Sequence, residues 1–188
     1  QESEAQTVGL RFQNVLIPQG VAITSAYVQF GVDETTSEAT SLTFHGQAAD
    51  SAAAFTSTAY NVSSRTKTSA SVTWASVPAW STIGEAGDNQ KTPDLSAVIQ
   101  EIVNRPGWSS GNALALIVTG SGKRVAEAYD GNSALAPTLS VTYRPSVAFT
   151  AASSSGAESA TSVNLAVALS AVSGQTVTVD YAVTGGTA

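Results

Sequence analysis

Alternation of apolar and polar residues dominates the first three quarters of the chain. In each alternating segment one face carries Val, Leu, Ile, Phe or Ala, and the opposite face is mostly polar. This period-two pattern predicts β-strands over 7–12, 23–32, 41–48, 125–129 and 138–143. Residues 113–119 are almost continuously apolar, which predicts a central strand with both faces covered. These segments predict an all-β fold.

A single segment departs from this pattern and has helical spacing. Residues 94–104 predict a short amphipathic helix because their apolar residues are Leu95, Val98, Ile99, Ile102 and Val103. Asp94 is the expected N-cap, and the Asn-Arg-Pro-Gly run at 104–107 is the expected stop. Gln100 and Glu101 are expected to face water.

Composition narrows the class of protein. The chain is 43% hydrophobic and 12% charged, which excludes a disordered chain. No apolar run approaches the roughly 20 residues of a membrane-spanning helix, so we expect no membrane insertion. The net charge of −6 argues against nucleic acid as a partner. Cysteine is absent, and position 1 is Gln rather than Met, so we expect a mature product or an internal fragment with any export signal removed.

A change in composition predicts two domains. All 8 Lys and Arg residues lie at or before Arg144, so we place domains at 1–144 and 145–188. The second has three alternating segments, at 147–149, 163–169 and 177–183, with turns expected at 156–157 and 173–174. Three strands leave edges and half an apolar face uncovered. Either further chain or another molecule is expected to cover this incomplete sheet.

Several core-packing runs carry a family resemblance. The first part of the chain resembles DNRLRE-type β-sandwich domains, which are similar to carbohydrate-binding modules of large bacterial secreted or surface proteins. The resemblance implies a jelly-roll-like antiparallel sandwich with one short helix. It rests on Val8-Gly9-Leu10-Arg11-Phe12, Ile23 to Phe30, Asp94 to Glu101, Asn112 to Leu116 and Pro137 to Val141. The strand that normally precedes the first of these runs is not evident.

The second part resembles the N-terminal half of a Calx-β domain, an immunoglobulin-like module. That similarity rests on Ser146 to Phe149 and on the run from Val177 to Ala188. It implies a partial immunoglobulin-like sandwich. Together the two resemblances imply a segment of a modular extracellular protein from a bacterium.

The histidine and three pairs of acids are the candidate catalytic groups. His45 is the sole histidine, lies on the polar face of a strand, and has no Gly-x-Ser-x-Gly motif to accompany it. Acid pairs that could serve glycoside hydrolysis are Asp33 with Glu34, Glu85 with Asp88, and Glu127 with Asp130. Turn-like settings explain these acids equally well. We therefore predict no enzyme activity.

Metal binding stays an open alternative. Calcium takes six to eight oxygen ligands from loops at irregular spacing. No EF-hand spacing of acids occurs, and no cofactor is predicted, although a structural calcium ion is compatible with the acids Asp33, Glu34, Glu38, Asp88 and Asp130.

Aromatic residues in long loops point to a polysaccharide partner. Sugar rings stack their C–H faces on exposed aromatic rings, and their hydroxyls need polar partners. The predicted stacking residues are Tyr60, Trp80 and Trp108, with Arg65 and Arg124 as polar partners. The alternative is that the two tryptophans seal the ends of the sandwich, as we expect of Trp74 in the core.

We therefore predict a non-catalytic extracellular or cell-surface module that binds polysaccharide or mediates adhesion. The rival hypothesis is a structural subunit of a filament or adhesin stalk, in which repeats self-associate by β-strand exchange through the incomplete C-terminal sheet.

Overall fold

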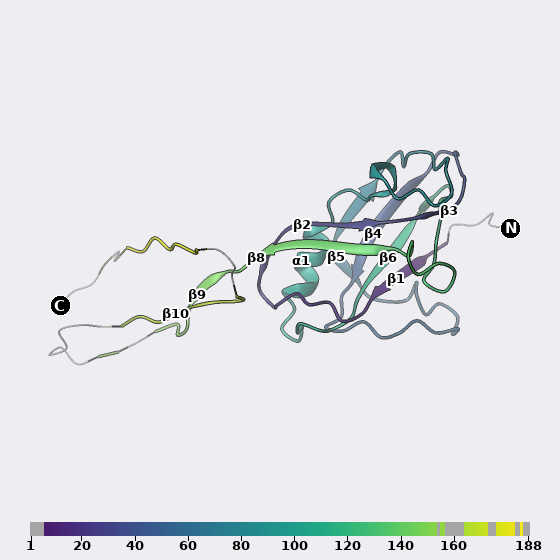
Figure 1. Ribbon diagram of the computed structural model, residues 1–188. Helices are drawn as coiled ribbons and strands as arrows, with labels where there is room; N and C mark the ends of the chain where they lie inside the picture. The colour runs from purple at the N-terminus through teal and green to yellow at the C-terminus, as the bar shows by residue number, and fades with distance from the viewer. Residues whose placement is uncertain (1–5, 154, 157–163, 173–175, 183–184, 186–188) are drawn as a thin grey trace.

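The computed structural model describes residues 6–153, 155–156, 164–172, 176–182 and 185. Within them the chain is mostly β with one short α-helix and a 3-10 turn (Figure 1). The elements in order are β1 (Val8–Phe12), β2 (Ala22–Gln29), β3 (Val32–Glu34), β4 (Ser41–Gln47), β5 (Lys67–Trp74), η1 (Asp88–Gln90), α1 (Ser96–Val103), β6 (Leu114–Ser121), β7 (Val125–Ala126), β8 (Thr138–Arg144), β9 (Val147–Phe149) and β10 (Val167–Leu169).

All strand pairings among these elements are antiparallel. The largest sheet has four strands in the order β1-β6-β4-β5, and the pairs β2-β8, β3-β7 and β9-β10 form two-stranded sheets. The predicted central strand is confirmed, because β6 lies between β1 and β4 and residues 114–118 are buried. Its outer face is covered in part by the loop after β4, from which Ala52 and Phe55 pack on Ala113 and Ala115.

The hydrophobic core joins the four-stranded sheet, the β2–β8 pair and α1. Figure 1 shows the β2–β8 pair crossing in front of the four-stranded sheet. Most of the apolar faces predicted for the strands are confirmed: Ala26, Val28, Val32 and Phe44 are fully buried, and Leu10 and Phe12 pack partly buried against them. Val8, on the same predicted face as Leu10, is 47% exposed instead. Trp74 is buried in the same cluster, as expected.

The helix forms where its spacing predicts, but its start differs. α1 begins at Ser96 with Leu95 at the N-cap position, so the prediction of Asp94 as N-cap is wrong. Asp94 still serves the first turn, because its carboxylate accepts hydrogen bonds from the Ser96 N–H (3.0 Å) and the Ser96 hydroxyl (2.8 Å). The four inward residues Val98, Ile99, Ile102 and Val103 are buried as predicted.

The tail, which we define as residues 145–188, follows β8 directly. β9 confirms the strand expected at 147–149, and β10 covers part of the second expected segment. Residues 176–182 have no assigned strand, so the third expected strand is not seen there. Position 163, position 183 and the turn at 173–174 lie outside the described residues, as does position 157 of the other expected turn. The Ser146 hydroxyl donates to the Gly20 carbonyl (3.1 Å), and Ala171 packs against the core.

Candidate functional site

The two tryptophans predicted to stack on sugars are buried. Trp80 and Trp108 are each 2% exposed, so their expected exposure is wrong. The Trp80 indole N–H donates to the Asn89 carbonyl (3.1 Å), and the ring contacts Phe30 with a centroid separation of 6.0 Å. The Trp108 indole N–H donates to the Ile17 carbonyl (2.9 Å). A carbonyl partner removes the cost of burying the N–H, so both rings belong to the core.

Arg65 braces the loop between β4 and β5. Its guanidinium makes five hydrogen bonds of 2.8–3.2 Å, and it lies 4.3 Å from the Phe55 ring centroid. Arginine has five N–H donors, so every donor is used. The acceptors are the carbonyl oxygens of Ala53, Ala54 and Asn61 and the side-chain oxygens of Gln47 and Asn61. Arg65 therefore has no free N–H for a sugar in this conformation.

Arg124 braces a second group of loops, which lie next to β4, β5 and β7. Its five N–H groups donate, over 2.5–3.0 Å, to the Thr40 hydroxyl and to carbonyl oxygens of Glu38, Val77, Pro78 and Lys123. Burial lowers the pKa of Arg124, and the nearby Glu38 carboxylate acts in the opposite direction. This side chain ties three chain segments together and has no donor left for a ligand.

Tyr60 differs from the other four predicted residues. Its side chain is 80% exposed, and its φ is +63°. A positive φ is uncommon for a bulky residue. Tyr60 adopts it within the loop that Arg65 holds in place. Thr56, Ser57, Thr58, Ser63 and Ser64 of the same loop are exposed and present hydroxyl groups. Of the predicted stacking residues, Tyr60 is the one whose ring is available to a ligand.

The structure therefore divides the predicted sugar site instead of assembling it. Tyr60 and Arg65 share one loop. Arg124 contacts the loop after β5, which also carries Trp80. Trp108 contacts Ile17 in the segment between β1 and β2. Sequence could not reveal that the arginines are saturated, because their acceptors are mostly main-chain carbonyls.

The other chemical candidates have ordinary surroundings. The His45 Nδ1 lies 3.4 Å from the Thr68 carbonyl oxygen. The Glu34 carboxylate is 3.4 Å from the Lys123 amine, and the Asp88 carboxylate is 3.9 Å from the Lys91 amine. In the part of the chain that the structure describes, no three His, Asp or Glu side chains gather as a metal site. In the same part, no helix is long and apolar enough to cross a membrane.

The segment around α1 seals the edges of two sheets, at β2 and at β5, and the sequence pattern did not predict this. The outward N–H groups of β2 donate to side chains: Ile23 to Gln100 (2.8 Å), Ala26 to Asp94 (2.9 Å) and Val28 to Thr92 (3.0 Å). The Glu101 carboxylate accepts from the N–H groups of Ser69 (2.9 Å) and Ala70 (2.8 Å) on β5. The expectation that Gln100 and Glu101 face water is therefore wrong, because both satisfy backbone groups that would otherwise lack partners.

The hydrogen bonds that seal the β2 edge also lower the pKa of the Asp94 carboxyl. Partial burial by itself would raise the pKa of the Asp94 carboxyl, but hydrogen bonds from the Ala26 N–H and from the hydroxyl and N–H of Ser96 lower it, and the net pKa lies below its usual value. Donors that point at a carboxylate favour its charged form. The ionised carboxylate is therefore part of the seal.

No protein-family model, curated protein or solved structure matches the chain. The two family resemblances therefore stay predictions.

Proposed function

We propose that the chain is a non-catalytic module of a larger secreted or cell-surface protein, which holds polysaccharide or mediates adhesion through the loop that displays Tyr60. We also propose that residues 1–144 form a jelly-roll-like sandwich and that 145–188 belong to a partial immunoglobulin-like unit. The four-stranded sheet, the crossing β2–β8 pair and the shared core support the first assignment.

The observation that carries this proposal is the exposed Tyr60 ring on a braced loop. A sugar face needs an aromatic surface that does not have to be ordered on binding. The five hydrogen bonds of Arg65 hold the loop in place, and the hydroxyls around Tyr60 supply donors and acceptors for sugar hydroxyls. The role of Arg65 is thus to position the loop rather than to contact the ligand.

The test is affinity electrophoresis of the chain in gels that contain soluble polysaccharides. A stacking ring contributes about 0.5–1.5 kcal/mol, so Tyr60→Ala should weaken binding about two- to tenfold. Tyr129→Ala is the matched control, since Tyr129 is 76% exposed on a different loop. Retarded migration that Tyr60→Ala leaves unchanged would remove this loop as the binding surface.

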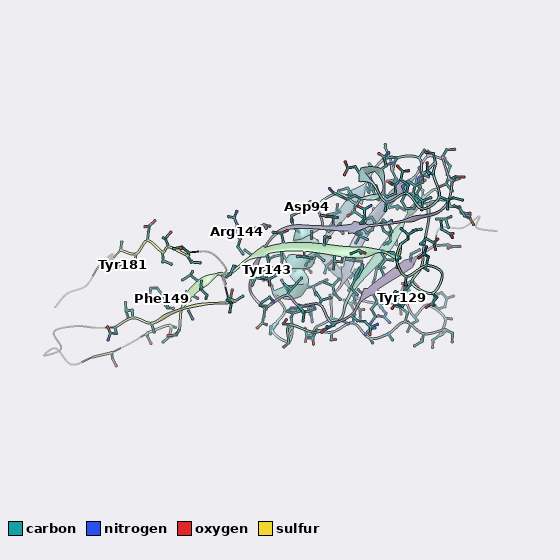
Figure 2. All side chains as sticks on the ribbon, in the orientation of Figure 1. Asp94, Tyr129, Tyr143, Arg144, Phe149 and Tyr181 are labelled. Carbon is teal, nitrogen blue, oxygen red and sulfur yellow. The ribbon has the colours of Figure 1, made fainter. Side chains whose placement is uncertain are left out.

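A second candidate function is favoured by the tail. Phe149, Val167 and Leu169 on the β9–β10 hairpin are large apolar residues that are 41–62% exposed. We call the part of the chain up to Arg144 the body. Figure 2 places Phe149 and Tyr181 beyond Tyr143 and Arg144, on the tail that extends from this body. Uncovered apolar strands favour pairing with a partner strand. We therefore keep a structural subunit of a filament or adhesin stalk, assembled by strand exchange, as the alternative.

A further inference from the structure

The outer side of β8 is an unpaired sheet edge. In an antiparallel ladder, residues directly opposite each other direct their N–H groups either both toward the partner strand or both away from it. Three residues of β2 direct their N–H groups away from β8, to the side chains described above. Their opposite residues on β8 must therefore direct their backbone groups outward; the pairs are Val28 with Leu139, Ala26 with Val141, and Ile23 with Tyr143.

A groove of about 410 Å³ lies beside this edge. One wall is β8, whose Leu139, Val141 and Tyr143 are only partly buried although they pack against the core. The other wall is the chain that follows β1, where Leu16 is 66% exposed. The lining carries no charged residue: Phe12, Gln13, Val15, Leu16, Ile17, Pro137, Thr138, Leu139, Val141 and Tyr143. We call this feature the β8 groove.

The β8 groove contrasts with the other edge of the body. Around α1, side-chain oxygens satisfy the outward N–H groups of both β2 and β5. Within the described residues, the backbone N–H groups of Leu139, Val141 and Tyr143 have no comparable partner. An exposed edge beside an apolar groove is the arrangement that accepts an added β-strand.

The tail contains a segment that matches the groove. Residues 176–182 have Val177, Val179 and Tyr181 at alternate positions, each 42% exposed or more. Alternate apolar residues in an extended strand lie on one face, at the spacing of Leu139, Val141 and Tyr143. The one charge in the segment is Asp180, which falls on the opposite face and would stay in water. An uncharged groove suits such a strand.

The geometry favours a second copy as the source of this strand. β9 continues outward from the end of β8, and Figure 1 shows the tail running away from the body. The tail of one chain thus extends away from the part of the chain that carries its own groove. A contact between two different surfaces of identical chains repeats head to tail and builds an open assembly.

We infer that the β8 groove binds residues 176–182 of a second copy of this chain as an added β-strand. This inference rests on the strand-exchange candidate above and is independent of the Tyr60 loop. It assigns the acceptor in the body and the donor in the tail, so that each copy both gives and receives a strand.

The test uses the absence of cysteine from the chain. Ser140→Cys lies on β8 between the groove residues, and Thr178→Cys lies between the apolar residues of the donor segment. The two variants are mixed with a short thiol-reactive cross-linker, and the products are mapped by mass spectrometry. In parallel, sedimentation velocity measures self-association of the otherwise unmodified chain and of Val179→Asp. Thr73→Cys on β5, mixed with Thr178→Cys, is the matched control.

We expect a cross-linked dimer from the first mixture and none from the control mixture. Association should rise with concentration and weaken at least tenfold in Val179→Asp, because a carboxylate would have to enter the apolar groove. The Val179→Asp change lies outside the body, so circular dichroism should be unchanged. A chain that stays monomeric at high concentration overturns both the inference and the strand-exchange candidate. Association that Val179→Asp does not weaken overturns the inference that residues 176–182 are the donor strand, but it leaves the strand-exchange candidate standing.

Discussion

Replacing Arg65 by Lys tests the loop brace while keeping the charge. Lysine has three donors on one nitrogen and cannot reproduce the planar fork. At least two of the five hydrogen bonds must be lost, and the planar guanidinium over the Phe55 ring is replaced by an ammonium group. Hydrogen bonds from a charged group contribute about 1.5–3 kcal/mol each when buried. The freed acceptors here are partly exposed and regain water, so we expect a local loss of about 2 kcal/mol.

The loss should appear as faster local opening rather than as global unfolding. A change of about 2 kcal/mol corresponds to roughly 30-fold faster amide exchange in the loop. The reporters are three loop N–H groups that donate within the loop, those of Thr56, Asn61 and Ser64. Exchange is followed by NMR at constant pH. Arg144→Lys, at an exposed arginine on β8, is the control and should leave these rates unchanged.

Two outcomes would refute the reasoning about Arg65. Unchanged exchange in Arg65→Lys would mean that the five hydrogen bonds do not hold the loop. A fall in overall stability as large as that of a core substitution would mean that the loop and the core unfold as one unit. The first result would also weaken the case for Tyr60 as a preorganised binding surface.

Three further perturbations probe the core, the edge seal and the loop packing. Phe44→Ala removes a fully buried ring and should lower the free energy of unfolding by about 3–5 kcal/mol in urea titrations; a loss under 1 kcal/mol would contradict the core assignment. The lowered pKa of Asp94 contributes stability that is complete above the unfolded-state pKa of about 3.9 and is lost as pH falls through the folded-state value. Urea midpoints between pH 2 and 6 should therefore fall less steeply below pH 4 in Asp94→Asn, and parallel curves would exclude this linkage. Gly9→Ala places a methyl group against the Phe55 ring, so it should shift the Phe55 ring resonances, and an unchanged spectrum would show that the ring does not rest on this glycine.

The strand and helix positions could be predicted because burial imposes a simple period on them. The alternation around Val28 and the spacing around Ile99 follow directly from which face meets the core. Trp80 and Trp108 could not be placed, since a tryptophan in a loop satisfies the same sequence pattern whether its N–H meets water or a carbonyl. The outcome depends on a distant main-chain atom, such as the Ile17 carbonyl for Trp108.

The candidate site was predictable only in part for a related reason. Tyr60 is exposed as its loop position suggested, but Arg65 and Arg124 bind carbonyls that no side-chain pattern reveals. The seal by Gln100 and Glu101 has the same origin, because it depends on which backbone groups a helix meets when it crosses two sheet edges. The open edge of β8 could not be predicted either. It depends on how β8 pairs with β2, and the residues of β8 alone do not reveal that pairing.

The central claim is that the body is sealed at the α1 edge and open at the β8 edge. Residue-resolved amide exchange on the dilute chain tests it most directly. We predict slow exchange for the N–H groups of Ala26 and Val28, which donate to side chains, and exchange at least tenfold faster for those of Leu139 and Val141. Equal protection at the two edges, or slower exchange at Leu139 and Val141, would contradict the claim.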